Sequence, residues 1–255
     1  MRLAEFQAIY VMWLRQMKRF YRAKSRIIAS IVQPLFFLFI LGSGFRVATF
    51  AGIEGDYIHF LAPGIITMAI MFSSMFTGVS VLWDKQFGFL QEVLVAPISR
   101  FSIIFGRTLG GATTALIQGF IILFISLALG VQIPSIFGFV LTLITMILVS
   151  FTAVGFGLIF ASKMNDFQGF QVIMNLLIMP LFFLSSAFFP IGESLPGWLR
   201  TIAYVNPMFY MVDGMRGSLT GVNNIFPPLI DLSIILVICI VMMGLGSYFF
   251  SKSEA

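Results

Sequence analysis

The sequence has 255 residues, of which 59% are hydrophobic and 10% are charged. Ordinary soluble domains contain about 25% charged residues, so the composition excludes a soluble domain and indicates an integral membrane protein. The net charge is +5, but the basic residues gather at the ends of apolar runs, which argues against nucleic-acid binding. A single cysteine, Cys239, and a single histidine, His59, exclude an internal disulfide and metal sites built from several such ligands.

The first predicted element is an amphipathic helix over residues 1–26. Apolar and aromatic residues such as Phe6 and Trp13 recur there at helical spacing, while Arg15 and Arg22 fall elsewhere on the helix. A basic amphipathic helix with aromatic anchors is typical of a membrane surface. We therefore expect an interfacial helix ahead of the first span.

Six apolar runs follow, and each approaches or exceeds the roughly 20 residues that a helix needs to cross a bilayer core. The stretch from Thr108 to Ser162 contains no charged residue, and Gly130 and Pro134 mark the turn that divides it into two spans. The sequence thus predicts an all-α, polytopic membrane protein with one transmembrane domain over residues 1–255. The predicted spans are residues 27–45, 60–83, 107–129, 136–161, 170–189 and 232–250.

Residues 84–100 separate the second and third predicted spans. Phe87, Leu90 and Leu94 recur at helical spacing, and Pro97 ends the pattern, which predicts a short amphipathic helix. Such a helix either docks a partner protein or merely lies among the lipid headgroups. The charged side chains that we expect a partner to reach are Asp84, Lys85 and Glu92.

Residues 190–220 are interrupted too often by proline, glycine and charged residues to cross a membrane, yet they are too apolar for a free loop. They are predicted to form two short re-entrant half-helices that dip into the outer leaflet. Trp198 and Tyr204 are the expected interfacial anchors.

The basic residues predict the orientation. Six spans place both termini on one side, and twelve of the fifteen lysine and arginine residues fall on that side. The positive-inside rule makes this side cytoplasmic. We therefore expect a multi-pass protein of the cell membrane with cytoplasmic termini, a cytoplasmic segment 84–100 and an external segment 190–220.

The chain encodes no evident source of energy. It has no Gly-x-x-x-x-Gly-Lys-Ser/Thr phosphate-binding loop. Its spans carry almost no acids or bases, which ion-coupled carriers usually place near the bilayer midplane. If the protein transports a substrate, we expect a partner to supply the work.

Two runs of residues carry a family resemblance. Residues 84–100 combine an acidic-basic start, a glycine, apolar residues, a proline and a final Ser-Arg, and residues 206–216 form an Asn-Pro motif ahead of the last span. With the basic entry helix and six spans, these runs resemble the membrane permease of type-two ABC exporters over most of the chain. That branch includes drug-resistance, polysaccharide and lipid exporters.

The resemblance implies that residues 84–100 are a coupling helix that sits in a groove of a separate nucleotide-binding ATPase subunit. It implies two permeases with two ATPases, hence a homodimer, with ATP and Mg on the partner ATPase, no cofactor on this chain and no catalytic residue. The implied ATPase-coupling residues are Asp84, Lys85, Phe87, Gly88, Leu90, Glu92, Leu94, Pro97 and Arg100. The implied external motif consists of Asn206, Pro207, Asp213 and Arg216.

Polar residues within the spans are candidates for a substrate path, although hydrogen bonding between helices is the alternative explanation. An aromatic-rich, nearly uncharged interior favours a hydrophobic or amphipathic substrate such as a drug, a lipid or a lipid-linked glycan. The alternative function is an ion-coupled secondary transporter. The candidate path residues are Thr77, Gln118 and Asn175.

Three further residues allow two interpretations each. Gly106 and Gly110, four positions apart, either let two helices approach closely or are ordinary membrane glycines. Arg107 either contacts substrate or extends its long side chain to the membrane interface, as basic residues near span ends usually do.

Overall fold

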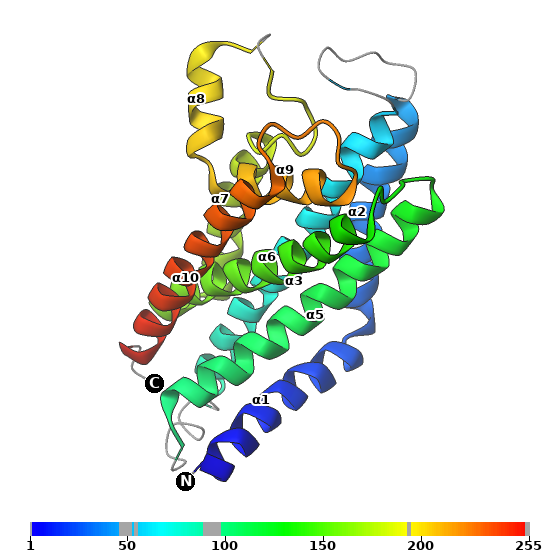
Figure 1. Ribbon diagram of the computed structural model, residues 1–255. Helices are drawn as coiled ribbons and strands as arrows, with labels where there is room; N and C mark the ends of the chain where they lie inside the picture. Colours follow the sequence, from blue (N-terminus) through cyan, green and yellow to red (C-terminus); the bar gives the residue numbers. More distant parts are fainter. Residues whose placement is uncertain (1, 46–52, 54–55, 89–97, 193–194, 253–255) are drawn as a thin grey trace.

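The computed structural model in Figure 1 describes residues 2–45, 53, 56–88, 98–192 and 195–252. These residues form α-helices joined by turns, and no strand occurs in the described part of the chain, so the predicted all-α class is confirmed. The helices are α1 (Arg2–Arg22), α2 (Lys24–Gly44), α3 (Tyr57–Gln86), α5 (Arg100–Ala128), α6 (Ile136–Lys163), α7 (Phe167–Phe183), α8 (Gly197–Val205), α9 (Pro207–Leu219) and α10 (Pro228–Lys252).

Five of the helices in these ranges are long and apolar enough to cross a membrane, namely α2, α3, α5, α6 and α10. The predicted span 170–189 corresponds to α7, whose boundaries differ: the helix has 17 residues, begins at Phe167 and ends at Phe183. The Asp166 carboxylate accepts hydrogen bonds from the amides of the first turn, which fixes the earlier start. Because α7 spans only about 26 Å at 1.5 Å per residue, a sixth crossing stays a prediction.

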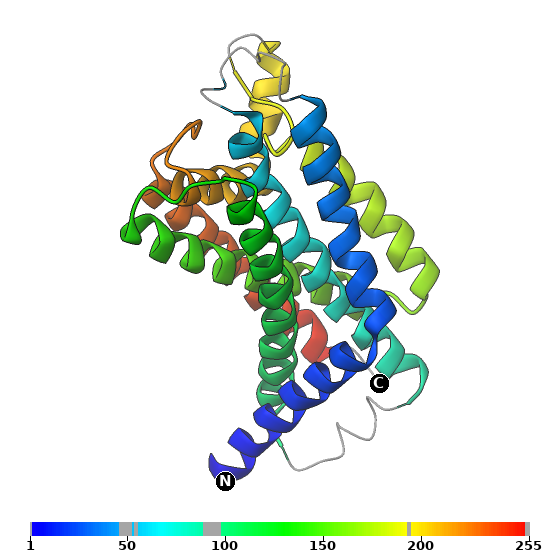
Figure 2. The same ribbon diagram turned by 90° about the vertical axis from the view of Figure 1, so that its right-hand side faces the viewer.

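Helix α3 lies at the centre of the protein, and 89% of its apolar stretch is buried. Helices α2, α5, α6 and α9 all pack against it, as the two views in Figures 1 and 2 illustrate. Close approach depends on glycine: a Cβ atom added at Gly78 would lie 2.6 Å from the carbonyl oxygen of Gly157 in α6. Packing at this distance holds the bundle together without lipid between the helices.

Helix α1 turns away from α2 at Ala23 and packs along α5 (Figure 2). A Cβ atom added at Gly106 would lie 2.8 Å from the carbonyl oxygen of Ile9, and one added at Gly110 would lie 2.6 Å from Cβ of Gln16. These two glycines therefore do allow two helices to approach closely. The position of α1 at a membrane surface stays a prediction.

The two short helices predicted within residues 190–220 are present as α8 and α9, and α8 stands clear of the bundle at one end (Figure 1). Trp198 is exposed, as expected of an anchor. Tyr204 differs, because its ring packs against Phe209 and Phe226 at centroid distances of 5.2 and 6.0 Å. Re-entry of this segment into the outer leaflet stays a prediction.

Candidate functional site

The predicted coupling segment begins where α3 ends. Phe87 follows the last residue of α3 and is 81% exposed, and Gly88 has a φ of +71°, a left-handed conformation that glycine adopts without strain. Helix α5 starts again at Arg100, with Ser99 as its N-cap. The predicted coupling residues Leu90, Glu92, Leu94 and Pro97 lie outside the described residues.

Asp84, in the last turn of α3, is buried beneath three arginines. Nη2 of Arg15 lies 2.6 Å from Oδ1, and Nη1 of the same residue donates to Oδ2 at 3.0 Å. Nη2 of Arg107 lies 2.7 Å from Oδ2, and Nη1 of Arg19 lies 3.6 Å from Oδ1. With only 4% of its side chain exposed, Asp84 is not available to a partner protein, in contrast to the expectation from the sequence. It joins α1, α3 and α5 instead.

Arg107 fits neither of its two sequence-based interpretations. Helix α5 begins seven residues before it, so Arg107 lies two turns inside the helix, and its side chain is 3% exposed. It reaches the Asp84 carboxylate rather than the membrane interface. Burying a guanidinium costs several kcal/mol of desolvation, roughly, unless a carboxylate compensates it, which makes each member of this pair depend on the other.

Lys85 and Arg100, at the two ends of the predicted coupling segment, donate hydrogen bonds to other helices. Nζ of Lys85 donates to the carbonyl oxygen of Ser162 at 3.1 Å, at the end of α6. A guanidinium nitrogen of Arg100 donates to the carbonyl oxygen of Ser251, at the end of α10. Among the predicted coupling residues that the structure describes, Phe87 is exposed and Gly88 is half-buried. Asp84, Lys85 and Arg100 instead connect the ends of the segment to other helices.

Glu5 of α1 holds the first turn of α5. Its carboxylate accepts hydrogen bonds from the Ser99 hydroxyl at 2.7 Å, from the Ser99 amide at 3.1 Å, and from the Ser102 hydroxyl. These bonds, led by that of Ser102, lower the pKa of Glu5 below its ordinary value of 4.5. No local pattern in the sequence points to Glu5, because its partners lie 94 or more positions away and meet it only when α1 packs against the start of α5.

The structure brings together two of the three candidate path residues. Thr77 and Gln118 line a hollow of about 30 Å³ between α1, α3 and α5, together with Ser73 and Ser80 of α3. Asn175 lies apart on the exposed side of α7, beside a second hollow of about 50 Å³. Pockets for drug-sized molecules measure roughly 300 to 1,000 Å³, so neither hollow alone accommodates such a substrate.

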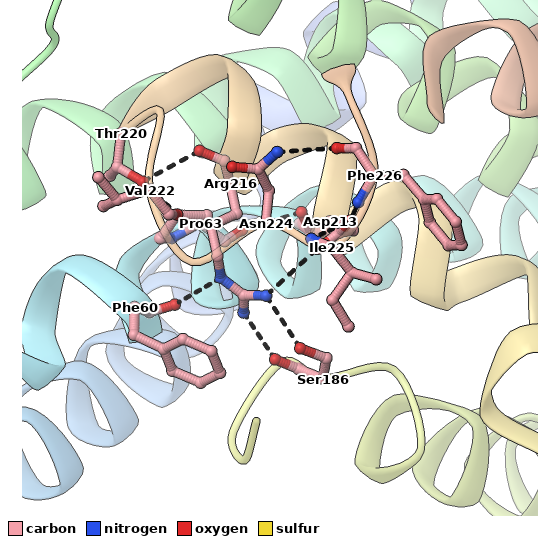
Figure 3. A network of polar contacts seen from close by, with 11 residues as sticks. Phe60, Pro63, Ser186, Asp213, Arg216, Thr220, Val222, Asn224, Ile225 and Phe226 are labelled. Atoms are coloured by element: carbon pink, nitrogen blue, oxygen red, sulfur yellow. Dashed lines mark hydrogen bonds and ion pairs between the residues drawn. The ribbon is translucent and has the colours of Figure 1, made fainter. Parts of the chain in front are cut away.

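The external motif forms a buried network around Arg216, drawn in Figure 3. The Arg216 side chain is fully buried, and it donates to the carbonyl oxygen of Phe60 at 3.3 Å and to both oxygens of Ser186 at 2.9 and 2.6 Å. Asp213 lies 3.7 Å from it and accepts from the amide of Ile225 at 2.9 Å. The network joins α3, α9, the turn after α7 and the loop before α10.

Asn206 and Pro207 begin α9. The Asn206 side-chain oxygen accepts from the Met208 amide at 3.0 Å, its nitrogen donates to the carbonyl oxygen of Leu181, and Pro207 occupies the first helical position. The motif therefore fixes the fold at this end. No sequence pattern points to Ser186 as a member of this network; its φ of +64° is uncommon for a residue other than glycine.

This chain matches one family profile and is similar to several named proteins. The profile of the ABC-2 type transporter family matches residues 7–220. The chain is 29% identical to a protein named as a transport permease, ycf38, of Cyanophora paradoxa, over 82% of this chain and 73% of the relative. It is 26% identical to the inner membrane transport permease YadH of Escherichia coli strain K12, over 92% and 90% of the two chains. It is also 30% identical to a protein named as a multidrug ABC transporter permease, YbhR of the same strain, over 62% of this chain and 43% of the relative.

Proposed function

The chain belongs to the ABC-2 type transporter family, and we propose that it is the membrane permease subunit of an ATP-driven exporter. A separate nucleotide-binding subunit supplies ATP hydrolysis, with its ATP and Mg. It docks from the cytoplasm on the segment between α3 and α5. Both termini lie on the same side, with α7 as the sixth crossing.

The observation that carries this proposal is the set of contacts at the two ends of residues 84–100, made by Asp84, Lys85, Ser99 and Arg100, which we call the frame. The segment begins at the end of α3, where Asp84 is bound by arginines of other helices. It ends at the start of α5, where Ser99 donates a hydrogen bond to Glu5 of α1. Lys85 and Arg100 tie the same two ends to α6 and α10. Because of these contacts, a displacement of the two ends of the segment would move α1, α3 and α5 together.

Such a frame suits alternating access. When two ATPase subunits close around nucleotide, each moves the segment that it holds, and the helices fastened to it follow as a rigid body. The exposed Phe87 ring offers an apolar contact at the start of the segment. The permease needs no ionisable group at the membrane centre to be driven in this way.

The substrate path runs between two copies of the chain. The two hollows lined by the candidate path residues are far smaller than a lipid or drug, which supports a path formed at a dimer interface. On α7, Gln171 and Asn175 are exposed next to Val172 and Leu176. Amide side chains in a lipid environment favour a hydrogen-bonding protein partner, and a second α7 meets this need. The apolar surroundings favour a hydrophobic or amphipathic substrate.

The test replaces Phe87 with glutamate, and separately Glu92 with glutamine, in cells that also express the ATPase of the same operon or system. We expect export to be lost and the ATPase to co-purify at no more than a tenth of its normal yield, while insertion into the membrane stays normal. Ile136→Glu is the matched control, since Ile136 is 86% exposed and begins α6 at the opposite end of the bundle. Normal co-purification with both coupling variants would refute the docking role. Export that persists without any ATPase but collapses with the proton or sodium gradient would identify an ion-coupled secondary transporter instead.

A further inference from the structure

A basic hollow lies at the junction of α1 and α2, and it shares Arg15 and Arg19 with the Asp84 cluster. Its volume is about 590 Å³. Arg15, Lys18, Arg19 and Arg22 line it, and Val11 and Leu14 add an apolar wall. Positions 11, 15, 18 and 22 recur at helical spacing, so these side chains project from one face of α1. The opposite face, around Ile9 and Gln16, packs on α5.

Lys18 and Arg22, two of the basic residues that line this hollow, form no ion pair within the described residues. Excess positive charge on a concave surface attracts an anion.

The depth of the hollow matches the phospholipid headgroup layer. The apolar stretch of α2 begins at Ile27, and Ala23, which lines the hollow, lies four residues earlier. Four residues rise about 6 Å in a helix, and the headgroup layer is roughly 5 to 8 Å thick on each side of the hydrocarbon core. If α2 crosses the membrane, a ligand at the Ala23 end of the hollow lies level with lipid phosphates.

We propose that this hollow binds the phosphate headgroup of an anionic phospholipid. Arginine forks match phosphate geometry, and the bidentate contact with Asp84 already holds Arg15 in place. Lys18 and Arg22, which also line the hollow, then bind the phosphate through their positive charges. Val11 and Leu14 accept the glycerol and first acyl carbons, which a free phosphate ion lacks. The inference does not depend on what the protein transports.

The experiment measures lipid binding to the purified full-length protein in detergent by native mass spectrometry. The probes are dioleoyl phosphatidylglycerol, dioleoyl phosphatidylcholine and inorganic phosphate. We expect phosphatidylglycerol to bind at least ten-fold more tightly than phosphatidylcholine. The Lys18→Gln/Arg22→Gln variant should lose about ten-fold or more of its phosphatidylglycerol affinity, because each basic residue near an anionic surface contributes measurably to attraction.

Two variants separate this site from general charge effects. Arg200→Gln/Lys252→Gln removes the same net charge from α8 and the end of α10, and should bind phosphatidylglycerol as the native chain does. Lys18→Arg/Arg22→Lys keeps both charges and should retain binding, which also excludes a folding defect as the cause of loss.

Three outcomes would overturn the proposal. The first is unchanged phosphatidylglycerol binding by the glutamine variant. The second is displacement of the lipid by an equal concentration of inorganic phosphate, which would identify a soluble anion as the ligand. The third is a glutamine variant that keeps the lipid but no longer co-purifies with the ATPase, which would identify the hollow as a protein-docking surface.

Discussion

The guanidinium of Arg107 lies 2.7 Å from the carboxylate of Asp84, and less than 5% of either side chain is exposed. This pair joins α5 to the last turn of α3, while Arg15 of α1 contacts the same carboxylate. A buried ion pair contributes little net stability by itself, but removal of one partner leaves a buried charge without compensation. Replacement of either residue of this pair should therefore destabilise the contacts that hold the start of the predicted coupling segment.

We predict that Asp84→Asn lowers the free energy of unfolding by about 3 to 5 kcal/mol, the usual cost of breaking a buried pair. Thermal unfolding in detergent measures this loss. The double variant Asp84→Asn/Arg107→Met should regain part of it, because the most deeply buried guanidinium is removed, while Arg15 and Arg19 are partly exposed to solvent. Asp166→Asn is the control, since asparagine caps a helix as well as aspartate does. Equal loss in the single and double variants would contradict the pairing.

Arg216→Lys should destabilise the opposite end of the protein. Lysine keeps the charge but cannot reach Phe60 and both oxygens of Ser186 at once, and hydrogen bonds to charged groups contribute roughly 1.5 to 3 kcal/mol each. The measurement is the unfolding temperature, or the rate of limited proteolysis between α7 and α10. Arg200→Lys on α8 is the matched change at a site outside this network. An Arg216→Lys protein as stable as the native one would refute the structural role of the external motif.

Two glycines allow a direct test of helix packing. A Cβ atom at Gly155 of α6 would lie 2.8 Å from backbone carbon and 2.9 Å from backbone oxygen of Met242 in α10, whereas one at Gly244 of α10 would meet nothing within 4 Å. Alanine inside a helix is favoured over glycine by about 1 kcal/mol. Gly244→Ala should thus be neutral or stabilising, while Gly155→Ala should destabilise by about 1 to 3 kcal/mol through overpacking. Chemical denaturation of the two variants side by side gives the comparison, and a stabilised Gly155→Ala would contradict the close packing of α6 and α10.

Glu5 should make the attachment of α1 to α5 depend on pH. Hydrogen bonds lower the pKa of Glu5 in the folded protein below the ordinary value of 4.5. A group with a lowered folded pKa stabilises the fold above its ordinary pKa, and this contribution is lost as pH falls through the folded value. The native chain should therefore have a higher unfolding temperature than Glu5→Gln at pH 7, and the difference should narrow as pH falls from 4.5. A difference that stays constant over this range would exclude the carboxylate as its source.

The sequence predicts the helices of this protein better than the contacts between them. Hydrophobicity along the chain predicts the N-terminal helix, five apolar helices and the two short helices, because each signal is local. It misplaces the end of α7, because the apolar run continues through Phe189 while the helix ends at Phe183. Position in a helix does not reveal which face is buried in protein rather than lipid. For this reason Arg107 and Asp84 were expected at accessible positions and are buried.

The contacts that decide these roles join residues far apart in the sequence. Glu5 meets Ser99, and Ser186 meets Arg216, through folding that no local pattern encodes. The pair Gly106 and Gly110 signals a possible close approach, but only the structure shows that the approaching helix is α1. Small residues spaced four apart thus predict an interface without identifying the partner.

In the proposed mechanism, the segment following Phe87 faces the cytoplasm and is held by an ATPase subunit. Crosslinking tests this arrangement: a cysteine replaces Phe87, whose native side chain is 81% exposed, and carries a cleavable photo-crosslinker. The native chain, whose Cys239 is buried, serves as the blank. We expect the ATPase subunit to be captured, and the yield of capture to change when nucleotide is added. Labelling of Phe87→Cys by a membrane-impermeant maleimide from outside intact cells, with no ATPase captured, would contradict this arrangement.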